Sequence, residues 1–158
     1  MLQLISSRIK QLVTSHESVG QIAKVNFVPF LPHDPIIVEA GAHTGKDTLG
    51  LARLFRKGRI HAFEPIPNLY QRLRRRTRWQ RNVTTYPLAL GAYDGRATVF
   101  VSSGSSDASS SLLEPRDHLV DHPDVFFSHQ IEAQVTTLDS WAATHGIDRV
   151  DFLWLDMQ

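Results

Sequence analysis

The sequence predicts an α/β domain built on a doubly wound, mostly parallel sheet. From residue 36 onward, short apolar runs rich in β-branched residues alternate with segments of helical periodicity, a pattern typical of parallel strands joined by right-handed crossovers. The chain has 158 residues, 42% hydrophobic and 21% charged, which suits one globular core. No apolar run reaches the ~18–20 residues of a membrane helix. The absence of cysteine excludes disulfides, Cys-ligated metals and thiol catalysis.

Two segments are expected along the chain. Residues 1–35 should form an N-terminal amphipathic helix, over residues 2–14, followed by an irregular lead-in from Val19 to Pro35. Residues 36–158 should form the domain that carries the ligand site. Its first half predicts three strands and two helices, because apolar β-branched runs are separated by segments with apolar residues at helical spacing. The strands are expected at 36–40, 59–64 and 83–90, and the helices at 49–55 and 68–79.

The pattern changes after Gly91. Residues 97–101 and 130–137 predict an inserted antiparallel pair of strands that brackets a long serine-rich and acidic loop. A short helix over 138–145 and a further buried strand over 150–156 should follow. Because the sequence stops directly after that strand, the sheet would lack the helix expected to cover it, and we expect a C-terminally truncated chain.

A glycine turn between the first strand and the first helix is the clearest functional signal. Gly41 and Gly45 allow a tight bend, and the helix N-terminus that follows offers N–H groups to an anionic group. A dinucleotide fingerprint requires a glycine where His43 stands, and a Walker loop requires Ser or Thr where Asp47 stands. Glu39, just before the turn, would repel a pyrophosphate but suits a cationic ligand such as the α-amino group of S-adenosylmethionine. Glu64 ends the next strand, where a carboxylate can accept both hydroxyls of a ribose.

Five segments then match a known family in order and spacing. They are Val38 to Gly45, Ile60 to Pro65, Leu88 to Gly91, Thr136 to Asp139 and Asp151 to Asp156. Together they resemble the FkbM-type methyltransferase family over about residues 36–158. The resemblance implies a class I (Rossmann-like) methyltransferase fold and S-adenosylmethionine as cofactor. It also implies O-methylation of a hydroxyl on a sugar, a glycan or a secondary metabolite.

The resemblance further implies roles for particular residues. The methionine end of the cofactor would be lined by Glu39, Gly41, Ala42, His43 and Gly45. The ribose would be held by Glu64, and the adenine would be flanked by Ala89 and Leu90. The sequence departs from the family at His43, where an Asn commonly stands. It also departs at Trp154, where a Lys is common, which weakens a catalytic role for a cation on that strand.

Two residues are candidates for the chemistry, and two for contact with the acceptor. Asp156, at the carboxyl end of the last strand, is expected to position the acceptor or serve as base, although an Asp there can simply cap the next turn. His43 could act near neutral pH or could only pack over the turn. Ser110 and Ser111 would lie over the site by the family resemblance, or belong to a flexible linker.

No metal site is expected. The cluster His118 to His122 lacks the glutamate that the zincin pattern requires after its first histidine, because Leu119 stands there. A solvated acidic loop is the simpler interpretation.

Charge is distributed unevenly along the chain. Residues 46–81 carry a balance of +9 and residues 94–156 a balance of −8, although the total is only +1. Such a split can mark an anionic partner or two faces of one domain that attract each other. The arginine-rich segment Arg72–Arg81, with Trp79 inside it, leaves a nucleic-acid-binding or nucleic-acid-modifying protein as an alternative, but a solvated helix face is the more frequent explanation. A non-catalytic fragment that keeps the turn is the other alternative. We expect a cytoplasmic enzyme with a small-molecule or glycan acceptor, no membrane contact and no nucleic-acid partner.

Overall fold

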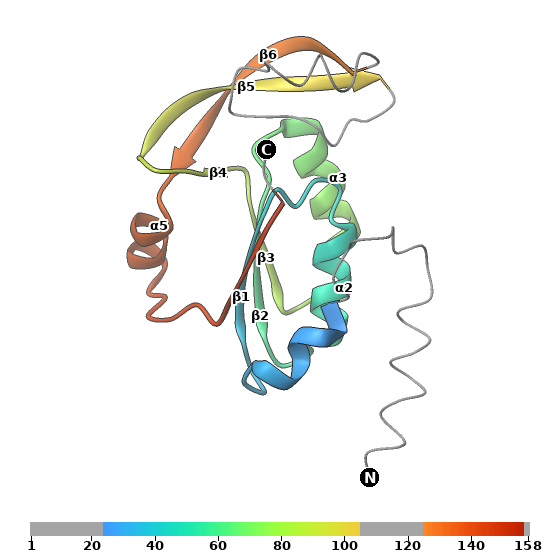
Figure 1. The fold of residues 1–158 in the computed structure, drawn as a ribbon, viewed down its shortest axis with the longest axis vertical. Helices are drawn as coiled ribbons and strands as arrows, with labels where there is room; N and C mark the ends of the chain where they lie inside the picture. Colours follow the sequence, from blue (N-terminus) through green and yellow to red (C-terminus); the bar gives the residue numbers. More distant parts are fainter. Residues whose placement is uncertain (1–23, 105–124, 157–158) are drawn as a thin grey trace.

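The computed structural model describes residues 24–104 and 125–156, and its centre is a four-stranded parallel sheet (Figure 1). The strands are β1 (Ile36–Ala40), β2 (Arg59–Phe63), β3 (Val83–Tyr86) and β7 (Phe152–Leu155), in the order β3-β2-β1-β7. The chain first proceeds from β1 towards β3 and later returns to add β7 on the other side of β1. The prediction of a doubly wound sheet is confirmed. In such sheets ligands bind at the carboxyl ends of the strands where the direction reverses, which here are β1 and β7.

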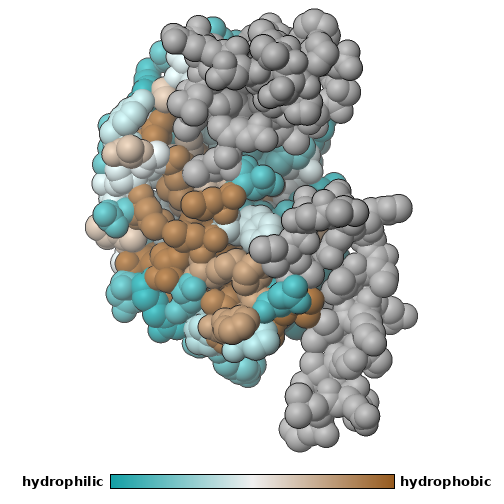
Figure 2. All heavy atoms as spheres, in the orientation of Figure 1, coloured by the Kyte–Doolittle hydropathy of each residue, from teal (hydrophilic) through white to brown (hydrophobic). Residues whose placement is uncertain are grey.

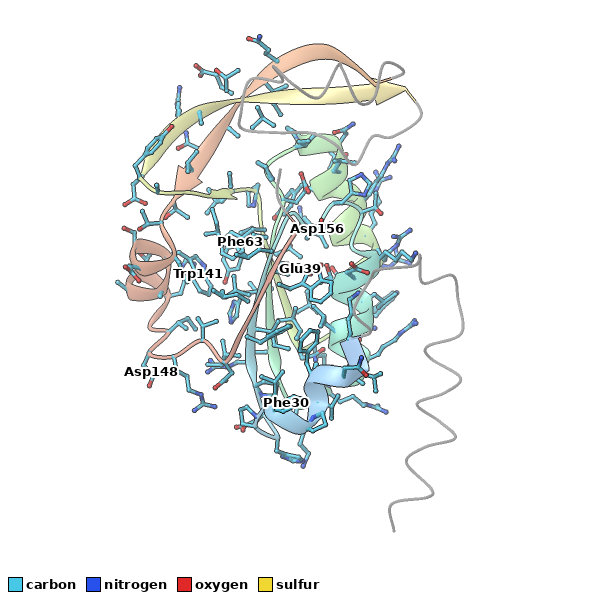
Figure 3. All side chains as sticks on the ribbon, viewed as in Figure 1. Phe30, Glu39, Phe63, Trp141, Asp148 and Asp156 are labelled. Carbon is cyan, nitrogen blue, oxygen red and sulfur yellow. The ribbon has the colours of Figure 1, made fainter. Side chains whose placement is uncertain are left out.

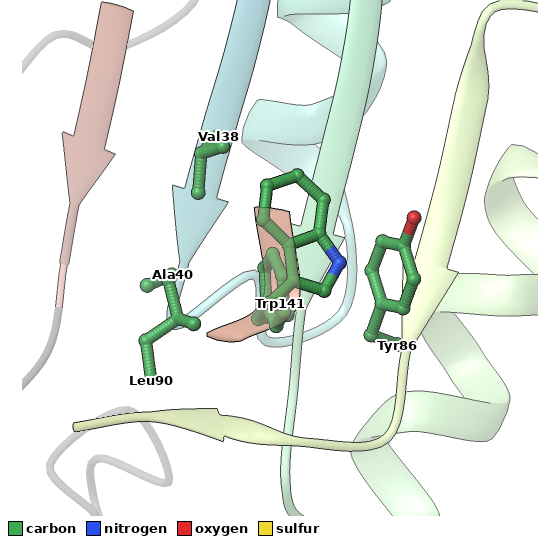
Figure 4. Packing of buried hydrophobic residues seen from close by; sticks show 6 residues of the cluster. Val38, Ala40, Tyr86, Leu90 and Trp141 are labelled. Carbon is green, nitrogen blue, oxygen red and sulfur yellow. The ribbon is translucent and has the colours of Figure 1, made fainter. Parts of the chain in front are cut away.

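Helices cover both faces of this sheet. Helix α2 (Lys46–Leu54) joins β1 to β2 and α3 (Pro67–Thr77) joins β2 to β3, on one face. On the other face, α5 (Leu138–His145) inserts Trp141, whose ring meets Phe63 at 5.2 Å edge-on (Figure 4). Alternate residues of β1 serve the two layers, since Val38 and Ala40 face α5 while Ile37 packs against α2. All five residues of β1 are buried, as expected for a central parallel strand.

A second sheet carries the predicted antiparallel pair. It contains β4 (Ala89–Leu90), β6 (Val125–Thr136) and β5 (Gly95–Gly104) in that order, with β5 antiparallel and β4 parallel to β6. The two long strands extend beyond the expected ranges. Val99, Ile131 and Ala133 pack against the first turn of α3, which fixes this sheet above the helix.

Three expectations about the elements were wrong in detail. The predicted strand 83–90 is divided, because Pro87 lies at the bend where the chain leaves the parallel sheet and enters the second one. Part of the expected irregular lead-in forms a 3-10 helix, η1 (Lys24–Phe30). The last strand is not fully buried: Phe152 and Trp154 pack inward, but Leu153 and Leu155 are 42% and 57% exposed. They point to the side of the sheet that carries α5, whose Trp141 packs against residues of β1, β2 and β3.

Figure 2 shows apolar side chains gathered in the middle of the viewed face.

Several expectations fall outside the described residues, namely the helix over 2–14, Ser110 and Ser111, and the cluster His118 to His122.

Candidate cofactor-binding site

The glycine turn has the tight bend that its sequence predicts. Gly41, His43 and Gly45 have φ angles of 82°, 49° and 77°, so three residues of this short turn lie in the left-handed region. Glycine is required at position 45 for a second reason, since a Cβ there would lie 2.7 Å from Cδ1 of Leu73 in α3. The turn therefore sits directly against α3.

Backbone hydrogen bonds join the turn to the end of β2. The N–H groups of Gly41 and Ala42 both donate to the carbonyl oxygen of Phe63, at 3.1 and 2.9 Å. The loops that follow β1 and β2 are thus held together at the carboxyl edge of the sheet.

Glu64 faces this turn. Its Oε2 accepts from the N–H of His43 at 2.7 Å, and its Oε1 accepts from the N–H of Ile66 at 2.9 Å. The side chain is buried, and burial raises the pKa of Glu64 while the two backbone N–H donors oppose that rise. Each carboxylate oxygen can accept more than one hydrogen bond, so Glu64 keeps acceptor capacity for ligand hydroxyls.

Glu39 is the second buried carboxyl of the site. It lies near the end of β1, only 1% exposed, and points towards α2 (Figure 3). Its Oε2 has no hydrogen-bond partner among the residues that the structure describes. Burial raises the pKa of Glu39 from 4.5 to about 8. The buried Thr48 hydroxyl beside it lowers that pKa part of the way, although the two groups do not meet the geometry of a hydrogen bond.

An ion pair closes one side of Glu39. Lys24 Nζ lies 3.0 Å from Asp47 Oδ1 and 4.4 Å from the centre of the Trp154 ring, which neighbours Glu39 across the β1–β7 pair. Asp47 raises the pKa of Glu39 and Lys24 lowers it. The two effects on this pKa oppose each other, and burial remains its largest cause.

Asp156 lies at the same edge. Its N–H donates to the carbonyl oxygen of Ala40 at 3.0 Å, which extends the β1–β7 pairing by one step, and its side chain is exposed. Figure 3 shows it above Glu39 at the end of β7, and its charge contributes to the raised pKa of Glu39.

The predicted site residues therefore divide into two groups. Those gathered at the carboxyl ends of β1, β2 and β7 are Glu39, Gly41, Ala42, His43, Gly45, Glu64 and Asp156. Ala89 and Leu90 lie in β4 instead, 5% and 7% exposed, where Leu90 packs with Ala40 and Trp141.

Three residues of the site were not predicted. Thr48 and Lys24 surround Glu39, and the Arg76 Nη1 donates to the hydroxyl of Thr44 in the turn at 3.0 Å. Thr48 had a weak signal, as the third residue of the helix after Gly45. Lys24 and Arg76 had none, because tertiary packing brings them to the turn.

This arrangement fits a ligand with a cationic end. An acid with an unpaired buried oxygen gains a partner from an ammonium group, and the first turn of α2, which has no side-chain cap, suits a neighbouring carboxylate. A zwitterionic amino-acid group carries both charges. The residues present therefore fit the methionine end of S-adenosylmethionine.

The model of the methyltransferase FkbM domain family matches residues 39–158. The chain belongs to the FkbM methyltransferase family. Its matched region begins at Glu39 and contains the glycine turn, Glu64 and Asp156. Family membership, together with the parallel sheet, confirms the class I methyltransferase fold that the resemblance implied.

Two curated relatives match this FkbM domain. The chain is 28% identical over 130 residues to the 2-O-methyltransferase NoeI of Sinorhizobium fredii, covering 79% of this chain and 54% of that protein. It is 42% identical over 53 residues to a malonyl-[acyl-carrier protein] O-methyltransferase of Halorhodospira halophila, covering 34% and 18%. The chain spans about half the length of the first relative and a smaller part of the second.

Two solved structures share a weaker likeness. They are a fibrillarin/Nop5p complex, with a TM-score of 0.36 and 14% identity over 56% of each chain, and a precorrin-6y C5,15-methyltransferase of Geobacter metallireducens. The second has a TM-score of 0.35 and 16% identity, covering 58% of this chain and 68% of that chain. At these TM-scores the likeness carries no argument.

Within residues 24–104 and 125–156, no group of three or more His, Asp or Glu side chains is placed to hold a metal ion. No helix in those ranges is long and apolar enough to cross a membrane.

Proposed function

We propose that this FkbM domain binds S-adenosylmethionine and belongs to an enzyme that methylates a hydroxyl group. The observation that carries the proposal is the orientation of Glu64, whose Oε2 accepts from the N–H of His43 and so lies against the glycine turn. A carboxylate there can also accept the ribose hydroxyls. Had Glu64 pointed away from the turn, the two halves of the expected site would not have met.

The remaining groups divide the cofactor between them. Glu39 would pair with the ammonium group, and the uncapped first turn of α2 would receive the carboxylate. Gly41 would keep the backbone of the turn free of a side chain where the ligand approaches, whereas Gly45 lets the turn pack against Leu73 of α3. Ala89 and Leu90 would contribute at most an apolar edge for the adenine, since both are already packed in the core.

Asp156 is the group we assign to the acceptor. The cofactor, when bound, supplies an electrophilic methyl group. The protein must then align a hydroxyl oxygen with that methyl group and remove the hydroxyl proton. Asp156 is the exposed carboxylate at the edge where β1 and β7 end, so it is placed to accept this proton or to orient the hydroxyl. His43 is the second candidate for proton transfer, and Ser110 and Ser111 remain candidates for acceptor contact.

The proposed acceptor class is based on the names of the two relatives. One of them is a 2-O-methyltransferase and the other an O-methyltransferase of a carrier-bound malonyl group. Methylation of oxygen is common to both names. A sugar or glycan hydroxyl is the acceptor that we propose, because the longer match is to the 2-O-methyltransferase.

Titration calorimetry with S-adenosylhomocysteine tests the cofactor site. Binding by the wild-type chain is expected, with Glu64→Gln at least tenfold weaker because an amide is a poorer acceptor for two hydroxyls. Glu132→Gln is the matched control, since that side chain is 73% exposed on β6 and should bind like wild type. Equal affinity of Glu64→Gln and wild type, with both folded by circular dichroism, would overturn the assignment of Glu64. Binding without methylation of any hydroxyl acceptor by the full-length enzyme would overturn the proposed reaction.

A further inference from the structure

We propose that the outer surface of α2, α3 and the turn after α3 binds single-stranded nucleic acid. This goes beyond the methyl-transfer site, and of the residues that it uses only Arg76 also contacts the glycine turn. The sequence alone favoured a solvated helix face. The structure adds three observations that favour a partner.

The first observation is that no carboxylate among the described residues neutralises the positive charge on this surface. All eleven Lys and Arg side chains between residues 46 and 81 are exposed: Lys46, Arg53, Arg56, Lys57, Arg59, Arg72, Arg74, Arg75, Arg76, Arg78 and Arg81. In the part of the chain that the structure describes, none of them forms an ion pair with a carboxylate. The two acids of this segment are engaged elsewhere, since Asp47 pairs with Lys24 and Glu64 is buried. Among the residues that the structure describes, the acids of the second half therefore do not pair with these cations.

The second observation is that the cations of α2 and α3 lie on the same side of the sheet. Helices α2 and α3 lie on the same side of the sheet (Figure 1), and Arg76 bonds α3 to the turn before α2. In α3 the buried residues Leu69, Leu73 and Thr77 recur every four positions, so its arginines occupy the remaining, outward part of the helix.

The third observation is an aromatic platform among the arginines. Trp79 is 79% exposed, and the Arg78 guanidinium lies 5.0 Å from the centre of its ring. The turn that presents them is fixed by the hydrogen bond from Gln80 N–H to the Thr77 carbonyl, at 2.8 Å. The exposed indole is therefore available for a planar group to stack on, in a setting that also supplies positive charge.

Phosphates and bases together match this surface better than other polyanions do. Arginine binds phosphate oxygens through two parallel hydrogen bonds, and an exposed indole stacks on a base of any sequence. A sulfated or carboxylated glycan would use the arginines but would leave Trp79 without a stacking partner. An anionic lipid surface would be expected to bind a belt of several apolar side chains, whereas Trp79 is the exposed large hydrophobic residue that α2, α3 and their loops present in the described structure.

Fluorescence anisotropy with a labelled twelve-nucleotide oligouridylate tests the proposal on the full chain. Binding is expected at low salt, and the logarithm of the association constant should fall linearly with the logarithm of salt concentration. The expected slope is about −2 to −3, which corresponds to about three or four phosphate contacts on a single strand.

Two variants separate stacking from charge. Trp79→Ala should weaken binding about tenfold without changing the salt slope, because it removes only stacking. Arg78→Gln combined with Arg81→Gln should weaken binding and make the slope shallower by about 1.4. Tyr93→Ala and Arg96→Gln are the matched controls, being an exposed aromatic and an exposed cation on the second-sheet side, and both should bind like wild type.

The outcomes are distinct. No binding at 50 mM salt, or a Trp79→Ala variant within twofold of wild type, would overturn the proposal. So would equal competition by dextran sulfate, or tight binding to phosphatidylglycerol vesicles with a blue shift of tryptophan fluorescence in place of oligouridylate binding. Calorimetry with S-adenosylhomocysteine should give the same affinity for Trp79→Ala and wild type. A failure of the nucleic-acid proposal would therefore not affect the assignment of the cofactor site.

Discussion

Glu39 shows how one buried carboxyl group can connect folding, pH and ligand binding. It sits on a central strand at 1% exposure, and its Oε2 has no partner in the described chain. A hydrophobic residue at this position would fill the space without an unsatisfied atom. The carboxyl group is therefore best explained as a binding partner for a cationic ligand. In the free chain it is protonated, which limits the energetic cost of burying it.

The free energy of unfolding should depend on pH through Glu39. The pKa is about 8 in the folded chain and 4.5 in the unfolded chain, so the folded state holds the proton more tightly. The stabilisation is complete below pH 4.5 and is lost as pH rises from 4.5 to 8. Glu39→Gln keeps a neutral side chain, and its stability relative to wild type should rise by about 4 kcal/mol between pH 4.5 and pH 9. Urea denaturation at both pH values measures this, with Glu132→Gln as a control that should show no such change.

Ligand binding should release a proton from the same group. Near pH 7 Glu39 is mostly protonated in the free chain, and a neighbouring ammonium favours its carboxylate form. S-adenosylhomocysteine carries that ammonium, so its binding should release up to one proton. Calorimetry in buffers of different ionisation enthalpy measures the release, which Glu39→Gln should abolish. A binding enthalpy that is independent of buffer in the wild type would show that Glu39 does not receive the ammonium group.

At the scale of elements, the sequence predicts what local chemistry determines. The glycine turn, the end of α5 at Gly146 (φ 63°) and the antiparallel β5–β6 pair all follow from residue type and periodicity. The 3-10 helix η1 was missed because it contains Pro29 and has no 3.6-residue apolar repeat. The position of Lys24 over Trp154 was missed for another reason: residues 130 positions apart meet only through tertiary packing. Local patterns thus gave the strands and the turn, and the surroundings of Glu39 required the structure.

Helix α5 offers a prediction about capping. Thr137 Oγ1 accepts from the N–H of Ser140 at 3.0 Å and so satisfies one of the free donors of the first turn. Thr137→Ala should lower the free energy of unfolding by about 1 kcal/mol. Thermal denaturation measures this loss, with Thr144→Ala as the control. The exposed Thr144 hydroxyl donates to the Ser140 carbonyl within the helix and does not cap a free N–H group. A larger loss in Thr144→Ala than in Thr137→Ala would show that the cap does not stabilise this helix.

Across the described molecule, the two faces of the parallel sheet differ in charge and in how far helices cover them. The α2 and α3 face carries the arginine-rich surface, whereas on the α5 face Trp141 packs against β1, β2 and β3, and Leu153 and Leu155 of β7 are exposed among the described residues. Leu153 and Leu155 lie two positions apart, so both point to this uncovered side, and β7 is also the edge of the described sheet. Exposed apolar side chains beside unpaired strand N–H and C=O groups favour association between chains.

Replacing both leucines should therefore reduce self-association of the 158-residue chain without unfolding it. A Leu153→Ser and Leu155→Ser double variant removes apolar side chains that are already 42% and 57% exposed, so its midpoint of thermal unfolding should fall by only a few degrees. Sedimentation velocity over a range of concentrations should show a smaller rise in sedimentation coefficient than for wild type. Tyr93→Ser, which removes a 55% exposed aromatic from the turn before β5, should associate like wild type. If the double variant associates as strongly as wild type, the exposed face of β7 does not mediate self-association. The next position to replace would then be Phe30 on η1, whose side chain is 82% exposed.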